Sequence, residues 1–295
     1  MPHTNPSPSE VDGDRIWYLG YGSNMNPKVL TGRRDVHPQL AVPVVVPGYA
    51  LTFHCPGFPY LEPSFASIDP RPPAASNGTK PTAMRPSSPI RGDPLAPDLH
   101  GVAVLITRQE YAQIQRTEGL GYGDVDVACE ATADAVTGTG DQQASDAMLA
   151  ASKTPIVRAG AKLVARALIQ KPEFRRPDAR PSVRYHKLLV DGAAHHRLPE
   201  SYQQWLQSLP SYSASSVRRR LGLITQVAVF APIFLFLLLI RRIMVVISGD
   251  HAPAWLASAF RFMSTCVWVL YAWILRPVFG DGGEWHTVPG QQKTH

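Results

Sequence analysis

Through the first two thirds of the chain, apolar residues come in short runs separated by turn-forming residues, and this pattern predicts strands. The first run, residues 16–19, leads into a turn that contains Gly20, Gly22, Ser23 and Asn24. Further strands are expected at 41–46, 49–53, 101–106, 125–131 and 162–169. The stretch 54–68, rich in Pro, Gly and aromatic residues, is expected to be a loop that ends in a short strand at 65–68.

Several helices interrupt these strands. Thr107 and Glu110 have the spacing of a capping box, in which each side chain covers a free backbone N–H group at the start of a helix. That helix should cover residues 108–117 and stop near Gly119, because glycine commonly follows a helix end. Proline in a first turn and apolar residues at helical spacing predict further helices at 27–30, 183–195 and 199–209.

Glu118 lies where the helix over 108–117 is expected to end. A carboxylate at this end of a helix is opposed to the helix dipole, so stability alone does not account for it. We therefore regard Glu118 as a candidate functional acid.

The C-terminal quarter has a different character. Residues 221–240 carry no charge, and a run of this length matches the hydrocarbon thickness of a bilayer. We therefore expect a transmembrane helix over 221–247, flanked by arginines. A second apolar stretch, 252–279, is interrupted by Arg261, and it is expected either to span the membrane or to lie at its surface.

Composition adds few constraints. The chain has 295 residues, a net charge of +6 and 28 prolines, and its basic residues flank the apolar run rather than form a face for nucleic acid. The three cysteines are far apart, so we expect no disulfide framework and no metal site. No cofactor is implied. The polar N-terminus lacks the apolar core of a signal peptide, which favours a cytosolic catalytic part on a membrane.

These patterns divide the chain into segments. Residues 1–14 are expected to be disordered, and 15–210 to form one folded domain. Two insertions poor in apolar residues, 69–98 and 132–155, interrupt this domain, and a polar tail covers 280–295.

The candidate chemistry combines the glycine-containing turn with Glu118. A turn of this kind presents backbone N–H groups that can bind a carboxylate or stabilise an oxyanion. The carboxylate of Glu118 can move a proton as general base and then as general acid, which is worth about 10²–10⁴-fold in rate. A serine triad with Ser23 as nucleophile is disfavoured, because Ser23 has no nucleophile-elbow context.

The residues in this order resemble the γ-glutamylcyclotransferase family, including its fungal membrane-anchored members. The resemblance covers about residues 16–210, and it excludes the two insertions and the apolar C-terminal segments. It is carried by Tyr21-Gly22-Ser23-Asn24-Met25, by the strand beginning Gly101-Val102, by Glu118-Gly119, and by Pro181-Ser182 with Tyr185, Gly192-Ala193, Leu198-Pro199 and Tyr202.

The resemblance implies an α+β fold, a small mixed β-barrel with flanking helices, here followed by one or two C-terminal transmembrane helices. It implies that the α-amine of a γ-glutamyl group attacks its own γ-carbonyl, which releases 5-oxoproline and an amino acid, peptide or amine. Glu118 matches the family's catalytic acid and base. The matched substrate-binding positions are Tyr21, Gly22, Ser23, Asn24, Met25, Tyr185 and, at a less regular spacing, Tyr122.

The substrate stays open at this point. A γ-glutamyl peptide or a glutathione-derived conjugate is expected, since related fungal members process glutathionylated metabolites. A γ-glutamylamine cyclotransferase would use a similar loop and acid with a different leaving group. A non-catalytic scaffold at a membrane is the third alternative, and Glu118 argues against it.

Overall fold

The computed structural model describes residues 9–11, 13–71, 96–118, 121–137, 157–248 and 254–284. The chain divides into two compact units. The first comprises Met1–Thr52, Ala66–Lys171 and Arg184–Leu209, and the second Phe53–Phe65, Pro172–Val183 and Pro210–His295. Most of the expected lead-in 1–14, of the insertions 69–98 and 132–155 and of the tail 280–295 lies outside the described residues.

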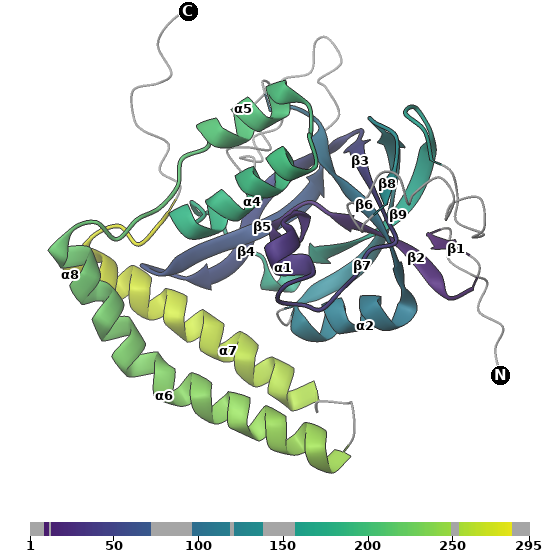
Figure 1. Ribbon diagram of the computed structural model, residues 1–295. Helices are drawn as coiled ribbons and strands as arrows, with labels where there is room; N and C mark the ends of the chain where they lie inside the picture. Colours follow the sequence, from purple (N-terminus) through teal and green to yellow (C-terminus); the bar gives the residue numbers. More distant parts are fainter. Residues whose placement is uncertain are drawn as a thin grey trace, which may run out of the picture. The chain divides into compact units, whose positions relative to one another are not determined.

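The first unit contains a closed five-stranded barrel (Figure 1). Its strands follow the order β2 (Arg15–Gly20), β6 (Leu99–Thr107), β3 (Leu40–Val46), β7 (Tyr122–Ala131) and β9 (Lys162–Gln170). Neighbouring strands pair antiparallel, and a parallel pairing of Tyr18 with Arg166 closes the barrel between β2 and β9. The mixed β-barrel expected from the sequence is confirmed.

Strand β6 lies between β2 and β3, and its continuous apolar run is explained by this central place. Residues from Gly101 to Ile106 are all buried. Gly101 allows β2 to approach closely, because a Cβ atom at this position would lie 2.7 Å from the carbonyl oxygen of Gly20. The end of β2, from which the candidate loop departs, is thus held against the middle of the barrel.

Among the described residues of this unit, four helices lie outside the barrel: α1 (Pro27–Leu30), α2 (Arg108–Thr117), α4 (Val183–His195) and α5 (Glu200–Ser208). The capping box of α2 is present in both directions. Glu110 N donates to Thr107 Oγ1 at 3.2 Å, and Thr107 N donates to Glu110 Oε2 at 2.8 Å. Two short strands were not expected, β1 (Glu10–Val11) within the lead-in and β8 (Val136–Thr137) within the second insertion.

The expected loop at 54–68 is wrong. Strands β4 (Tyr49–Phe58) and β5 (Glu62–Pro70) form a hairpin there instead. Its turn requires Tyr60 in the left-handed region, at φ 64°, a conformation that tyrosine rarely adopts. The prolines hid the strands, and the left-handed position of the turn holds a tyrosine rather than the glycine or asparagine that would signal it.

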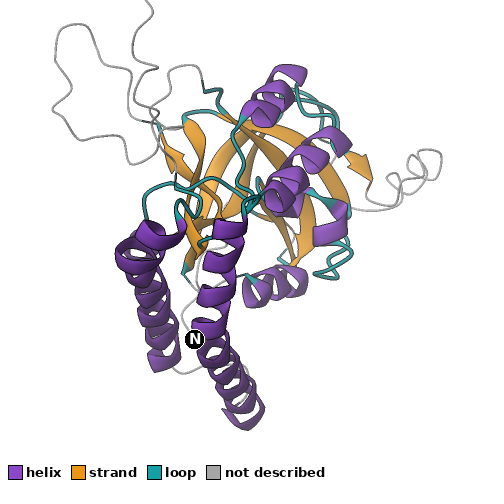
Figure 2. Cartoon of the chain, turned by 90° about the vertical axis from the view of Figure 1, so that its left-hand side faces the viewer, coloured by secondary structure: helices purple, strands orange, loops and turns teal. Residues whose placement is uncertain are grey.

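The tip of this hairpin belongs to the second unit, together with η2 (Pro172–Phe174) and the C-terminal helices. Helix α6 (Val217–Ser248) and helix α7 (Ala254–Leu270) lie side by side (Figure 2). A π-helical turn, η3 (Tyr271–Leu275), continues α7 into α8 (Arg276–Phe279). Both apolar helices are long enough to cross a membrane, over Val217–Met244 and Ser258–Phe279. The expected helix at 221–247 therefore forms, and the second stretch, 252–279, is helical from Ala254 onwards.

Aromatic packing joins the hairpin tip to these helices within the second unit. Tyr60 packs edge-on against Tyr271, with ring centroids 5.5 Å apart. Phe58 does the same against Phe234 at 5.8 Å. Trp268 Nε1 donates to the carbonyl oxygen of Gly57 at 3.2 Å. These aromatic contacts therefore hold the middle of α6 and the end of α7 against the hairpin tip.

Candidate active site

The glycine-containing turn of β2 continues into a short 3₁₀ helix, η1 (Ser23–Met25), whose N-cap is Gly22. No side chain caps this start, so its first backbone N–H groups have no side-chain partner there. Met25 is buried and anchors the loop, because Gly192 of α4 lies directly against it. The loop thus presents backbone donors while its far end is fixed in the core.

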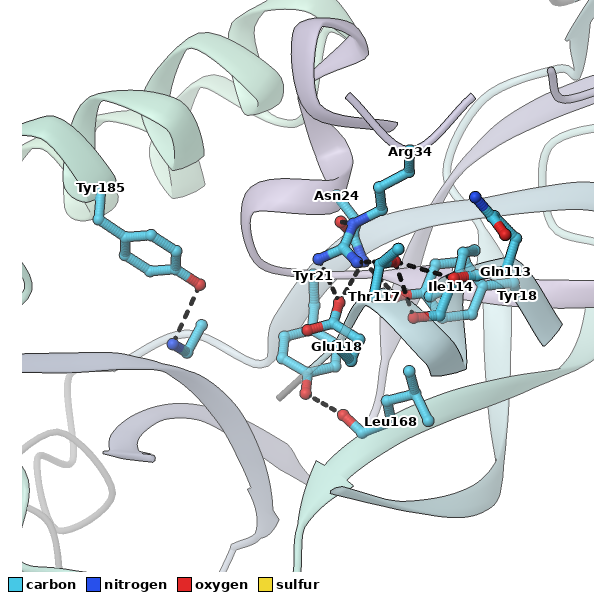
Figure 3. A network of polar contacts seen from close by, with 11 residues as sticks. Tyr18, Tyr21, Asn24, Arg34, Gln113, Ile114, Thr117, Glu118, Leu168 and Tyr185 are labelled. Atoms are coloured by element: carbon cyan, nitrogen blue, oxygen red, sulfur yellow. Dashed lines mark hydrogen bonds and ion pairs between the residues drawn. The ribbon is translucent and has the colours of Figure 1, made fainter. Parts of the chain in front are cut away.

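Glu118 is the C-cap of α2, and its extended backbone (φ −72°, ψ 153°) ends the helix. Its Oε1 atom accepts from Asn24 Nδ2 at 2.9 Å and from Arg34 Nη2 at 2.8 Å (Figure 3). Within the described part of the chain, no hydrogen bond reaches Oε2. The carboxylate is therefore held through one oxygen and keeps the other for a further partner.

One further residue, Tyr18, and a bond between Arg34 and Asn24 complete this network. Arg34 Nε donates to Asn24 Oδ1 at 2.8 Å, and Asn24 Nδ2 donates to the hydroxyl of Tyr18 at 2.7 Å. Burial, and secondly the negative charge of Glu118, raise the pKa of Tyr18 well above its usual range. Its hydroxyl therefore stays protonated at every physiological pH and cannot compete with Glu118 as a base.

The tyrosines of the site have different surroundings. The hydroxyl of Tyr21 donates to the carbonyl oxygen of Leu168 on β9. The hydroxyl of Tyr185, from α4, accepts from the backbone N–H of Ala66 at 3.1 Å (Figure 3). These bonds tie the site to two strands that are far from the loop in sequence.

A pocket of about 310 Å³, part of it open to solvent, brings these groups together. Seven of the eight residues expected from the sequence line it, Met25 being the exception. Its lining consists of Tyr18, Tyr21, Gly22, Ser23, Asn24, Ala66, Glu118, Tyr122, Leu168 and Tyr185. Among the described residues, no cluster of three His, Cys, Asp or Glu side chains could hold a metal ion.

Curated fungal proteins share most of the length of this chain. The γ-glutamyl cyclotransferase aclK of Aspergillus oryzae is 31% identical over 279 residues, which cover 92% of each chain. The chain belongs to the γ-glutamyl cyclotransferase family. The γ-glutamyl cyclotransferase gliK of Aspergillus fumigatus is 30% identical over 90% of this chain and 89% of that protein.

A solved structure titled γ-glutamyl cyclotransferase is more distant. It has a TM-score of 0.45 and 16% identity, over 69% of this chain and 92% of that one. A likeness this low supports no conclusion about function. No family model matches the chain. Membership of the family rests on the curated relatives, and it makes the chain an enzyme with cyclotransferase function.

The family pattern did not identify every residue of the cyclotransferase pocket. Tyr18 was read only as part of an apolar strand, although a buried tyrosine hydroxyl needs a polar partner, and this was the available signal. In the sequence, Arg34 is one of two adjacent basic residues. Nothing in the sequence distinguishes it from Arg33, yet Arg34 is buried and Arg33 is exposed.

Proposed function

We propose that the pocket binds a γ-glutamyl group and that Glu118 carries the protons of its cyclisation. The hydrogen bonding of the Glu118 carboxylate supports this proposal most directly. Its Oε1 is held by Asn24 and Arg34, while Oε2 has no hydrogen bond within the described residues. A general base needs such an unoccupied oxygen within reach of the proton that it takes.

The loop supplies the complementary half of the binding site. A γ-glutamyl group carries an α-carboxylate, which the uncapped N–H groups at the start of η1 can bind. The hydroxyl of Ser23 lines the pocket and makes no hydrogen bond within the described chain, so it is a second donor for this carboxylate. The α-ammonium group then lies towards Glu118, the acid of the pocket.

The reaction balances without water or an external reagent. Glu118 takes a proton from the α-ammonium group, and the resulting amine attacks the γ-carbonyl carbon of the same molecule. As the amide C–N bond breaks, the protons lost by the attacking nitrogen pass through Glu118 to the leaving nitrogen. The products are 5-oxoproline and the released amine. Because nucleophile and carbonyl are already tethered, positioning contributes much of the rate.

The substrate class follows from this chemistry. A γ-glutamyl peptide or a glutathione-derived conjugate of secondary metabolism carries the γ-glutamyl group and a leaving amine, and we propose this class as the substrate. A γ-glutamylamine, from which a simple amine leaves, is the alternative substrate. The names of the relatives argue against a scaffold without activity.

The test compares substrates and one variant. The full-length protein is incubated with γ-glutamyl dipeptides, glutathione, glutathione conjugates and γ-glutamyl-lysine, and the release of 5-oxoproline is measured. Turnover of the conjugates in preference to γ-glutamyl-lysine is expected. Glu118→Gln keeps the shape of the side chain but removes the base, so it should lose turnover with an unchanged melting temperature. Activity that survives in Glu118→Gln would refute the role of Glu118.

We also propose that α6 and α7 anchor the protein in a lipid bilayer as a helical hairpin. Ile224, Leu235 and Phe236 of α6 are 62%, 63% and 61% exposed, which is costly in water for side chains of this size. Arg218 Nη2 donates to the carbonyl oxygen of Pro277 at 3.1 Å, so the start of α6 lies beside α8. If both helices span, the catalytic part and the C-terminus lie on the same side of the membrane, in the cytosol.

Exposed positions test the anchor without disturbing the packing. Leu235→Asp places a charge near the middle of α6, which costs about 2.5–3.5 kcal/mol in a bilayer, and should release protein into the supernatant after carbonate extraction. Val217→Asp is the matched control, since Val217 is 73% exposed but stands at the start of the helix. Equal retention of both variants in the pellet would contradict a spanning α6. Reporters inserted between residues 249 and 253 and at the C-terminus should lie on opposite sides.

A further inference from the structure

We infer that Arg34 is a positioning residue of the cyclisation, which orients Glu118 by holding one of its two carboxylate oxygens. This inference rests on the proposed role of Glu118 as the proton carrier. It concerns a residue outside the motif Tyr21–Met25, on the turn that follows α1.

All three nitrogens of the Arg34 guanidinium group are used, each by a different residue. Nε donates to Asn24 Oδ1 at 2.8 Å, Nη1 donates to Thr117 Oγ1, and Nη2 donates to Glu118 Oε1 at 2.8 Å. One guanidinium group thus joins the substrate-binding loop to the end of α2. The planar, rigid fork of arginine makes this geometry specific.

The contacts close a ring of three side chains (Figure 3). Arg34 binds Asn24, Asn24 binds Glu118 through Nδ2 at 2.9 Å, and Glu118 binds Arg34. A carboxylate on a single bond can rotate, whereas two donors on the same Oε1 atom fix its direction. The ring therefore determines where Oε2 points, which is the oxygen left for the substrate.

The charges support the same role. The side chains of Arg34 and Glu118 are only 11% and 18% exposed, so neither charge is well hydrated. The cation lies 2.8 Å from the carboxylate that must accept the first proton. Once Glu118 is protonated, it no longer neutralises the positive charge of Arg34. That charge then lies beside the reacting carbonyl, where negative charge develops.

A purely structural role for Arg34 is the competing explanation. Through Thr117 and Glu118 it also interacts with the C-terminus of α2, where a cation is favourable for the helix dipole. Such a role would lower the melting temperature but would leave turnover of the folded enzyme unchanged. Kinetics of the folded variants separate the two explanations.

The experiment uses full-length Arg34→Ala, Arg34→Lys and Glu118→Gln, with Arg33→Ala as the control for loss of a neighbouring exposed charge. In Arg34→Ala we expect kcat to fall about 100-fold while KM changes less than about threefold, because misplacing a reacting group by about 1 Å costs that much. Arg34→Lys should be intermediate, since an ammonium group cannot reproduce the three-way fork. Arg33→Ala should behave as the wild type.

Chemical rescue gives a second readout. Millimolar guanidinium should restore kcat of Arg34→Ala at least about tenfold by occupying the vacated site, with no effect on Arg33→Ala. A purely structural arginine would not show rescue of kcat at an unchanged melting temperature.

Three results would overturn the inference. The first is a kcat of Arg34→Ala within threefold of the wild type while Glu118→Gln is inactive. The second is a rise of KM alone in Arg34→Ala. The third is a failure of guanidinium to restore kcat of Arg34→Ala. If Arg34→Ala does not fold, a folded Arg34→Lys with wild-type kcat overturns it equally. Activity in Glu118→Gln, by contrast, would refute the proposed function itself, so the two failures are distinguishable.

Discussion

A single methyl group at Gly22 tests the geometry of the pocket. A Cβ atom there would lie 3.0 Å from the hydroxyl oxygen of Tyr185 and 3.2 Å from the Cβ of Ala66. Both separations are tighter than ordinary van der Waals contact, so Gly22→Ala must push the two walls apart. The bond from Ala66 N to the Tyr185 hydroxyl, now 3.1 Å, is the first interaction expected to break.

The magnitude follows from these contacts. Loss of one buried hydrogen bond costs about 1 kcal/mol, and overpacking by a methyl group costs about 1–3 kcal/mol. We expect Gly22→Ala to lose about 1–3 kcal/mol of stability. The methyl group also enters the space that the γ-glutamyl group would occupy. A fall in kcat/KM of about 10–100-fold, equivalent to about 1.4–2.7 kcal/mol, is therefore expected.

Gly20→Ala is the matched control in the same loop. Its Cβ would approach nothing closer than the backbone of Asn24, at an ordinary 3.4 Å. The assay measures release of 5-oxoproline from the best substrate, beside thermal unfolding of each variant. Tyr185→Phe should lose the same bond to Ala66, so combining it with Gly22→Ala should destabilise less than the sum of the two changes.

The result that would refute this reasoning is specific. If Gly22→Ala keeps kcat/KM within threefold of the wild type, the pocket does not bind substrate against this wall. If Gly20→Ala is as harmful as Gly22→Ala, the loop is sensitive to any added side chain, and the contact with Tyr185 is not the cause.

Three other changes are predicted. Thr107→Ala removes the capping box of α2 and should cost about 1 kcal/mol in thermal unfolding. Gly192→Ala places a Cβ 2.8 Å from that of Met25, so it should lower both the melting temperature and activity by displacing the loop. Burial, and secondly the neighbouring His195, lower the pKa of His196 from 6.5 to about 4. The unfolded chain therefore takes up a proton first as pH falls, and stability is lost between about pH 6.5 and 4. His196→Gln should flatten the dependence of stability on pH over this range, and His195→Gln, which removes only the second cause of the shift, should flatten it less.

Much of the barrel could be predicted because its signals are local. The capping box gave α2 its bounds of Arg108–Thr117, and the apolar run at 101–106 lies within β6. The hairpin β4–β5 could not be predicted in the same way. Its turn depends on Tyr60 in a left-handed conformation, and its tip packs against helices more than 150 residues away. A short window of the sequence shows neither the left-handed conformation of Tyr60 nor this distant packing.

The residues of the site divide in the same way. Sequence patterns identify some of them, and the others depend on contacts between distant segments. Local patterns indicated Glu118 and the glycine-containing turn, and the family pattern added the remaining positions. The structure places all of them except Met25 in the lining of one pocket. Arg34 was not found, because its role exists only where the turn after α1 meets the end of α2. Leu168 and Ala66 contribute mainly backbone groups, which no side-chain pattern can identify.

The incomplete bonding of Glu118 is itself an argument for its function. A buried ion pair seldom adds stability over apolar packing, because both charges lose their hydration. The second carboxylate oxygen, Oε2, is not one of the buried polar atoms that lack a partner, so solvent or a substrate in the pocket can reach it. Here Asn24 and Arg34 both bind Oε1, and Oε2 has no bond in the described chain. The arrangement orients the carboxylate through one oxygen and leaves the other accessible, which is what proton transfer with a bound substrate requires.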